Sequence, residues 1–352
     1  MNLDDVSFIK NNDSQNMLGQ IDSLPDQLAS AWTLGLSLPL PDWANIRQVV
    51  IAGMGGSAIG ADLLAAYALS SCPVPVFVHR DYGLPAFASG PETLFIASSH
   101  SGNTEETLDA FETARARSCR ALALCTGGQL EHRARAGNIP VWTFAHNGQP
   151  RAAVGFSFGL LLACFFRLAL IPNPEKDLRQ ALTAMRSQQE TLQVDVPVVQ
   201  NPAKRLAGQL VGRWVNIYAA GLLTPVARRW KGQINELAKA GAGFEFLPEA
   251  DHNALAGVEH PAILMQTLTI FLQSPSDHPR NRLRLDLTRR AFMQAGLNTD
   301  VYTAQGDSPL AHIWTALHFG DYLAFYLAAI YGVDPTPVQA LEEFKQALKE
   351  IG

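Results

Sequence analysis

The sequence predicts an α/β protein built on doubly wound parallel sheets, and three observations support this prediction. Near-continuous apolar runs alternate with longer helical patterns over most of the 352 residues, which is typical of parallel strands buried on both faces. Polar loops rich in glycine or serine follow two of these runs, at the strand ends where open α/β sheets bind ligands. The second half of the chain repeats the rhythm of the first, which indicates two copies of one α/β unit.

Composition narrows the class of protein. The apolar fraction is 47% and the net charge is -5, and the basic residues form no block, so the sequence does not favour a nucleic-acid binder. Four cysteines lack the spacing of a metal site or a disulfide framework, and we expect small buried residues of a reducing compartment. They are Cys72, Cys119, Cys125 and Cys164. The first residues lack a signal pattern, so we expect a cytoplasmic protein.

The chain divides into four expected segments. We expect residues 1–40 to form a helical segment that precedes the first domain, called the helical lead here. Pro39 and Pro41 mark its end. We place the first α/β domain at 41–172, a linker helix at 173–202 and the second α/β domain at 203–352.

Residues 152–171 are apolar over nearly the length of a membrane span. Arg167 lies inside this segment, and a charge within lipid is costly. We therefore predict a buried helix of a globular core and no membrane partner.

The first strand of the first domain enters a glycine turn. Gln48 to Gly56, QVVIAGMGG, predicts a buried strand and a turn, with a helix opening at Ser57. The glycines are not spaced as the dinucleotide fingerprint requires, and the P-loop pattern is absent. Further strands are expected at 74–79, 94–97, 120–125 and 140–145.

A serine-rich loop follows the strand at 94–97 and is the clearest candidate for an anion site. Four hydroxyls surround Gly102, directly before an acidic helix start, and belong to Ser98, Ser99, Ser101 and Thr104. A helix N-terminus and a glycine that admits close approach favour a phosphate there. An ordinary capped turn explains the same residues equally well.

The strands of the second half match those of the first at similar offsets. The run at Trp214 matches the run at Val49, the run at Ile263 matches that at Leu94, and the run at Val301 matches that at Val141. We expect the second copy to have lost both polar loops, so that the two halves do different work.

Three features of the second half offer chemistry that the first lacks. The helical segment Trp230 to Lys239 carries Glu236, the turn Pro248 to Asn253 carries His252, and the terminal amphipathic helix carries Lys345. Each has an ordinary alternative, because charged helix faces and turn histidines usually contact water.

Five motifs in order give the chain a family resemblance. GMGGSAIG, SSHSGNTEET, PRAAVGFSFG, the Glu236 and His252 pair and GDYLAFYLAAIYGVDPTPVQALEEFKQAL resemble the bifunctional phosphoglucose/phosphomannose isomerases. The resemblance runs from about residue 45 to the end. It implies two sugar isomerase (SIS) domains, each a flavodoxin-like three-layer sandwich, and a homodimer whose subunits share active sites.

The resemblance also implies roles for single residues. Glu236 would move a proton between C1 and C2 of a sugar 6-phosphate, and Arg151 would stabilise the enediolate. His252, from the neighbouring subunit, and Lys345 would assist ring opening. No cofactor and no metal are implied. The substrate-binding set would be Gly55, Gly56, Ser57, Ser99, Ser101, Thr104 and Thr336.

The function that follows is the interconversion of glucose 6-phosphate, mannose 6-phosphate or both with fructose 6-phosphate through a cis-enediol. A non-catalytic regulatory SIS protein that binds sugar phosphates is one alternative, although such a protein has no need of Glu236. An aminosugar-phosphate isomerase or deaminase is another. His100 stands in the serine loop where we expect tyrosine in relatives, which leaves the surroundings of the phosphate site open.

Overall fold

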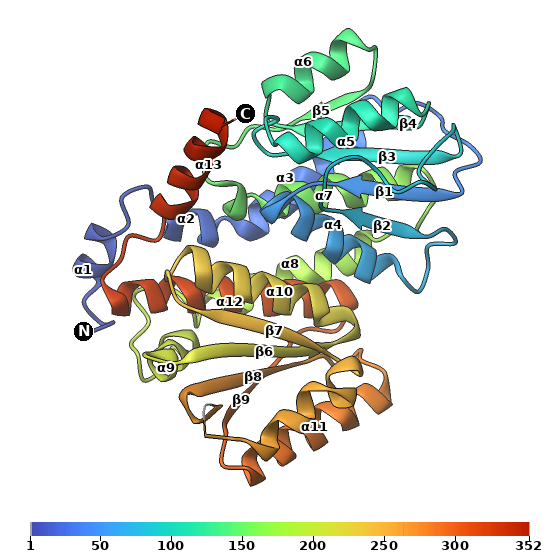
Figure 1. Ribbon diagram of the computed structural model, residues 1–352. Helices are drawn as coiled ribbons and strands as arrows, with labels where there is room; N and C mark the ends of the chain where they lie inside the picture. The colour runs from blue at the N-terminus through green and yellow to red at the C-terminus, as the bar shows by residue number, and fades with distance from the viewer. Residues whose placement is uncertain (1, 263, 352) are drawn as a thin grey trace.

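The computed structural model describes residues 2–262 and 264–351. Two parallel sheets lie at opposite ends of the molecule, and a layer of helices separates them (Figure 1). This layer includes α10 (Thr224–Glu236) and α12 (Pro309–Tyr331). The predicted α/β class with two parallel sheets is confirmed.

The first sheet has the strand order β2-β1-β3-β4-β5, and every pair is parallel. Its order reverses between β1 and β3, so the loops after these two strands lie beside each other at the switch point, where such sheets bind ligands. The strands are β1 (Gln48–Ala52), β2 (Val76–His79), β3 (Thr93–Ser98), β4 (Arg120–Cys125) and β5 (Val141–Thr143). The helices of this half are α4 (Gly55–Ala68), α5 (Glu105–Ala116), α6 (Gly128–Ala136), η1 (Pro150–Ala152) and α7 (Val154–Arg167).

The second sheet has the order β7-β6-β8-β9. Its strands are β6 (Trp214–Ala220), β7 (Ala242–Leu247), β8 (Thr267–Gln273) and β9 (Asn298–Thr303), with α11 (Pro279–Gln294) after β8. Short 3₁₀ turns lie at η2 (Gly221–Leu223), η3 (Glu249–His252), η4 (Ala254–Glu259) and η5 (Leu264–Gln266). The order repeats that of β2-β1-β3-β4 in the first sheet.

One of the three predicted strand matches is wrong. The run at Val301 lies in β9, which pairs with β8 as β4 pairs with β3, so its counterpart is β4 and not the strand at Val141. An apolar run carries no information on which neighbour it pairs with, so similar offsets along the chain suggested the wrong partner. Ile263, from which the second match was counted, lies outside the described residues.

The expectation that the second half has lost both polar loops is wrong for the loop after β8, whereas the turn after β6 keeps a glycine but is otherwise apolar. Gly221 follows β6 with a φ of 48°, much as Gly55 follows β1 with a φ of 50°. A polar turn follows β8, in which the Ser274 N–H donates to Asp277 Oδ2 over 3.0 Å and the Ser274 hydroxyl contacts His312 Nδ1 at 3.1 Å. The turn resembles the serine loop in position but contains a buried carboxylate.

The predicted helical lead forms α1 (Val6–Asn11), α2 (Met17–Asp22) and α3 (Leu24–Ser37). Helix α3 packs along α7, and the Arg167 guanidinium donates to the carbonyl of Gly35 over 2.7 Å. The segment predicted as a buried helix at 152–171 is therefore confirmed as core, with its charge satisfied by the end of α3. Helices α8 (Glu175–Gln189) and α9 (Pro202–Leu210) connect the halves.

Helix α12 is the centre of the second core. It is long and apolar enough to cross a membrane by length and composition, yet 94% of its most apolar window is buried inside the fold. His318 on this helix contacts the carbonyl of Ile21 through Nε2 at 2.9 Å, which ties α12 to the helical lead. A final helix, α13 (Gln339–Ile351), leaves this core at the end of the chain (Figure 1).

Candidate active site

The glycine turn after β1 and the serine loop after β3 are joined directly. The Ser57 hydroxyl, at the start of α4, accepts a hydrogen bond of 3.1 Å from the main-chain N–H of His100. Gly102 has a φ of 65°, and a Cβ on it would lie 1.9 Å from the carbonyl oxygen of Gly127. The loop can therefore take this shape only with glycine at that position.

The hydroxyls of the serine loop do not cap the helix behind it. Thr104 is the N-cap residue of α5, but in the described structure its side chain makes no capping hydrogen bond. Instead Thr104 Oγ1 lies 2.9 Å from Ser99 Oγ, and Ser101 Oγ accepts from the Asn103 N–H over 3.2 Å. Ser99 is buried and Ser101 is exposed. Hydroxyls gathered before a helix N-terminus can bind an anion, so this arrangement favours the cradle over the capped turn.

The glycine turn also fixes the place of Arg151. A Cβ on Gly56 would lie 2.5 Å from the carbonyl oxygen of Pro150 and 3.1 Å from the Cα of Arg151, so only glycine lets η1 approach the start of α4 this closely. A narrow cavity here is lined by residues that include Ser57, His100 and Pro150. The Ser57 hydrogen bond and the close approach at Gly56 therefore link the serine loop to the segment that carries Arg151.

Arg151 makes polar contacts with residues of the second half of the chain. Its Nη1 lies 3.4 Å from Glu236 Oε2, and its side chain is only 6% exposed. Its Nη2 donates to the carbonyls of Pro335 and Thr336, the first over 3.1 Å. Burial lowers the pKa of Arg151, whereas the carboxylate of Glu236 acts in the opposite direction.

Two polar atoms at this junction have no hydrogen-bond partner among the described residues. They are Nε of Arg151 and Oγ1 of Thr336, and both are buried. Buried polar atoms are normally hydrogen-bonded. Both belong to residues that contact each other, since Arg151 Nη2 donates to the Thr336 carbonyl.

A buried ion pair that the sequence analysis missed holds this arrangement from behind. Arg229 donates to both carboxylate oxygens of Asp321, over 3.0 and 2.8 Å, with each side chain 3% exposed. The same guanidinium donates to the main-chain carbonyl of Arg151 over 2.5 Å. Only the spacing of Arg229 on α10 and the single acid within the apolar α12 could have signalled the pair.

The ring of His100 pairs with a second histidine. His100 Nε2 lies 3.0 Å from His146 Nδ1, and His146 packs edge-on against Phe156. Burial lowers the pKa of His100 to about 4, with His146 contributing, and burial also lowers the pKa of His146. Both rings are therefore neutral near pH 7, and the surroundings of the serine loop are an uncharged aromatic cluster.

One of the predicted catalytic residues, His252, lies apart from Glu236 within one chain. Glu236 ends α10 before β7, and His252 ends η3 after it. The six residues of β7 span roughly 20 Å at about 3.3 Å per residue. Lys345 lies on α13 and is exposed. Arg151, Glu236 and Thr336 therefore lie together within one chain, whereas His252 lies beyond the other end of β7.

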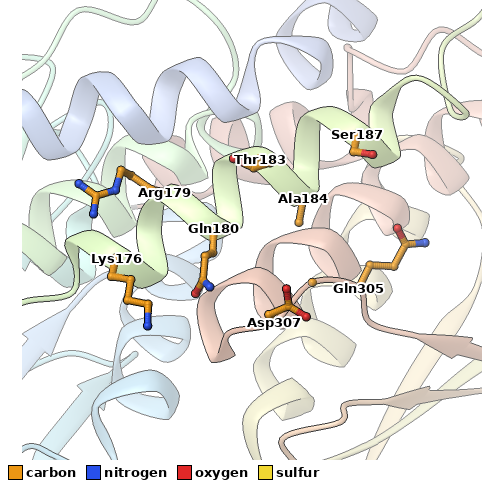
Figure 2. Close-up of a pocket in the computed structure, with 9 residues that line it drawn as sticks. Lys176, Arg179, Gln180, Thr183, Ala184, Ser187, Gln305 and Asp307 are labelled. Atoms are coloured by element: carbon orange, nitrogen blue, oxygen red, sulfur yellow. The ribbon is translucent and has the colours of Figure 1, made fainter.

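A wider hollow lies elsewhere. It measures about 540 Å³ between α8 and the start of α12, and contains none of the predicted site residues (Figure 2). Arg179 points away from Gln180 and Asp307 in this view, and its guanidinium pairs with Glu175 at 2.9 Å. Among the described residues, no group of three or more His, Cys, Asp or Glu side chains is placed to hold a metal ion.

Comparison with known proteins identifies close relatives. The family described as bacterial phospho-glucose isomerase C-terminal SIS domain matches residues 199–348. A bifunctional phosphoglucose/phosphomannose isomerase from Caldicellulosiruptor bescii is 39% identical over 95% of this chain and 99% of its own. One from Aquifex aeolicus is 31% identical over 88% and 92%. A hypothetical protein from Thermus thermophilus, 18% identical, superimposes with a TM-score of 0.75 over 98% of this chain and 93% of its own.

Proposed function

The chain belongs to the bifunctional phosphoglucose/phosphomannose isomerase family, and from that membership we propose how its residues carry out the reaction. It is an aldose-ketose isomerase of hexose phosphates. The observation that supports the site is the contact between Arg151 and Glu236, which joins the anion-type loops of the first half to a carboxylate of the second. We assign the two SIS domains to residues 41–172 and 203–352, with the site between them.

Glu236 is the base. Its carboxylate takes the proton from C2 of the open-chain aldose and returns it to C1 through a cis-enediol intermediate. The hydroxyl proton on O2 passes to O1 in the same conversion, which leaves the C2 carbonyl of fructose 6-phosphate. Negative charge develops on the sugar oxygens during this transfer. The buried guanidinium of Arg151 is fixed by Pro335 and Thr336, and a charge held in place before the reaction stabilises that oxygen without reorganisation.

The serine loop holds the 6-phosphate. Ser99, Ser101 and Thr104 present hydroxyls at the N-terminus of α5, where main-chain N–H groups and the helix dipole favour an anion. Gly55, Gly56 and Ser57 line the sugar between this loop and Arg151. Binding energy from the remote phosphate then fixes C1 and C2 beside Glu236.

Ring opening requires a second copy of the chain. Within one chain β7 separates His252 from Glu236, so a histidine that assists at this site comes from a partner subunit. Helix α13, which carries Lys345, presents an exposed apolar stripe of Leu341, Phe344 and Leu348, as a helix does when another surface covers it. We propose a homodimer with shared sites, in which His252 and Lys345 open the sugar ring.

The same proposal covers substrate and location. The substrate is glucose 6-phosphate, mannose 6-phosphate or both, with fructose 6-phosphate as the product. All four cysteines are free thiols, which suits the reducing interior of the cytoplasm.

A coupled assay for fructose 6-phosphate formation, run on the wild type with each aldose, tests the function. We expect turnover of at least one aldose and its loss in Glu236→Gln. Binding of both sugars without turnover in the wild type would contradict the proposal and favour a regulatory sugar-phosphate sensor.

A further inference from the structure

Lys239 has an unusual backbone conformation beside the proposed base. It lies three residues after Glu236, in the turn between α10 and β7, with a φ of 55°. This left-handed region disfavours residues that carry a Cβ. Non-glycine residues held in it occur often at functional sites, which directs attention to what the side chain contacts.

The Lys239 ammonium contacts the main chain of Glu236 and a carbonyl that Arg151 also contacts. Its Nζ donates to the main-chain carbonyl of Glu236 over 2.7 Å and to that of Pro335 over 3.3 Å. The Pro335 carbonyl also accepts from Arg151 Nη2 over 3.1 Å, so two cations converge on one oxygen.

One donor of the ammonium is left for a ligand. A protonated lysine has three N–H groups, and the two carbonyls account for two of them. Lys239 as a whole is exposed, although its ammonium lies partly buried where it contacts the Pro335 carbonyl. A substrate oxygen beside the Glu236 carboxylate could accept the third.

The charge of Lys239 depends on its neighbours. Burial of the ammonium and the nearby Arg151 cation lower the pKa of Lys239 to about 8, while Asp334 and Glu236 act in the opposite direction. Lys239 is therefore a cation at neutral pH and loses its charge in mildly alkaline solution.

We propose that Lys239 is a further catalytic residue of this site, whose free N–H donates to the oxygen on C1 or C2 of the sugar. It shares with Arg151 the negative charge that develops on that oxygen. No proton or group leaves the ammonium, because Glu236 alone moves the C1/C2 proton. This inference rests on the assignment of Glu236 and Arg151 made above.

The test uses Lys239→Gln, which keeps a donor but not the charge, and Lys239→Arg, which keeps the charge at every accessible pH. Lys231→Gln, on the same helix, is the control. We expect Lys239→Gln to lower kcat by about 100-fold, the usual effect of removing one donor to a developing oxyanion. We expect Lys239→Arg to retain more activity than Lys239→Gln. The kcat of the wild type should fall above about pH 8, as Lys239 loses its proton, and this fall should move to higher pH in Lys239→Arg.

Inhibition by inorganic phosphate separates this role from phosphate binding. The inhibition constant should be unchanged in Lys239→Gln, because the serine loop holds the phosphate. Thermal melting of both variants should stay near that of the wild type, since Lys239 is exposed.

Three results would overturn the inference. The first is a kcat and KM within twofold of wild type for Lys239→Gln, and the second is an unmoved alkaline limit in Lys239→Arg. The third is a phosphate inhibition constant that weakens as much as the KM. If the wild type is active and Glu236→Gln is not, such results contradict only the role proposed for Lys239. An inactive wild type would contradict the proposed function as well.

Discussion

Arg151 Nη1 lies 3.4 Å from Glu236 Oε2, although the two residues are 85 positions apart in the chain. The arginine belongs to a 3₁₀ turn after the first sheet, and the glutamate ends a helix of the second half. The proposed reaction therefore depends on how the two halves pack, and its predictions test both the chemistry and that packing.

Glu236→Gln should lower kcat by about 10²–10⁴-fold, the usual contribution of a positioned general base. The amide has nearly the same shape, so KM and the melting temperature should change little. Glu175→Gln, in an exposed pair with Arg179, is the matched control and should keep full activity. A kcat for Glu236→Gln within fivefold of wild type would show that another group moves the proton.

Ser101→Ala and Thr104→Ala should act on KM. Each removes a hydroxyl from the proposed phosphate site, and hydrogen bonds to charged groups contribute about 1.5–3 kcal/mol, so KM should rise roughly 10- to 100-fold. The effect on kcat should be smaller, because the phosphate lies at the unreactive end. Thr113→Ala, further along α5, serves as control. Unchanged KM in both loop variants would place the phosphate elsewhere.

The strands and their loops could be predicted because their signals are local. Apolar runs such as Leu94 to Ala97 and the glycine turn after β1 follow from periodicity and backbone constraints over a few residues. The serine loop needed one further step, since only the contact between Thr104 and Ser99 separates a cradle from a capped turn.

Relationships between distant segments could not be predicted in the same way. Tertiary packing determines which strand pairs with β9 and which acid pairs with Arg229, namely Asp321. It also determines that the Pro335 carbonyl accepts a hydrogen bond from Arg151. Lys239 was visible only as one charge on a helix face, because its bonds go to main-chain carbonyls that no side-chain pattern reveals.

Shared sites predict recovery of activity on mixing. Glu236→Gln and His252→Ala homodimers should each be impaired, but a mixed dimer has one site in which both residues are wild type. Random exchange of subunits gives half mixed dimers with one intact site of two, so about a quarter of wild-type activity should return. The measurement is the coupled assay after unfolding and refolding the variants together. Refolding each variant alone is the control, and no gain on mixing would contradict shared sites.

Acid should destabilise the fold through the histidine pair. The pKa of His100 is lowered from 6.5 to about 4 and that of His146 is also lowered, so the unfolded chain binds protons more tightly. The stability they provide is complete above about pH 6.5 and is lost as the pH falls towards 4. His146→Gln should reduce this loss, measured as Tm against pH, whereas His132→Gln, on an exposed ring, should not. If Tm falls at acid pH in His146→Gln just as it does in the wild type, other groups control the loss of stability in acid.

The buried pair behind Arg151 should matter to both stability and catalysis. Asp321→Ala leaves the guanidinium of Arg229 buried without its carboxylate, and breaking a buried pair in this way usually costs about 3–5 kcal/mol. Urea unfolding should show a loss of this size, whereas Asp26→Ala, which breaks an exposed pair with Arg186, should cost at most about 1 kcal/mol. Because Arg229 also donates to the Arg151 carbonyl, the folded fraction of Asp321→Ala should show a lower kcat at unchanged KM. A folded variant with normal kcat would mean that Pro335 and Thr336 position the Arg151 guanidinium without help from Arg229.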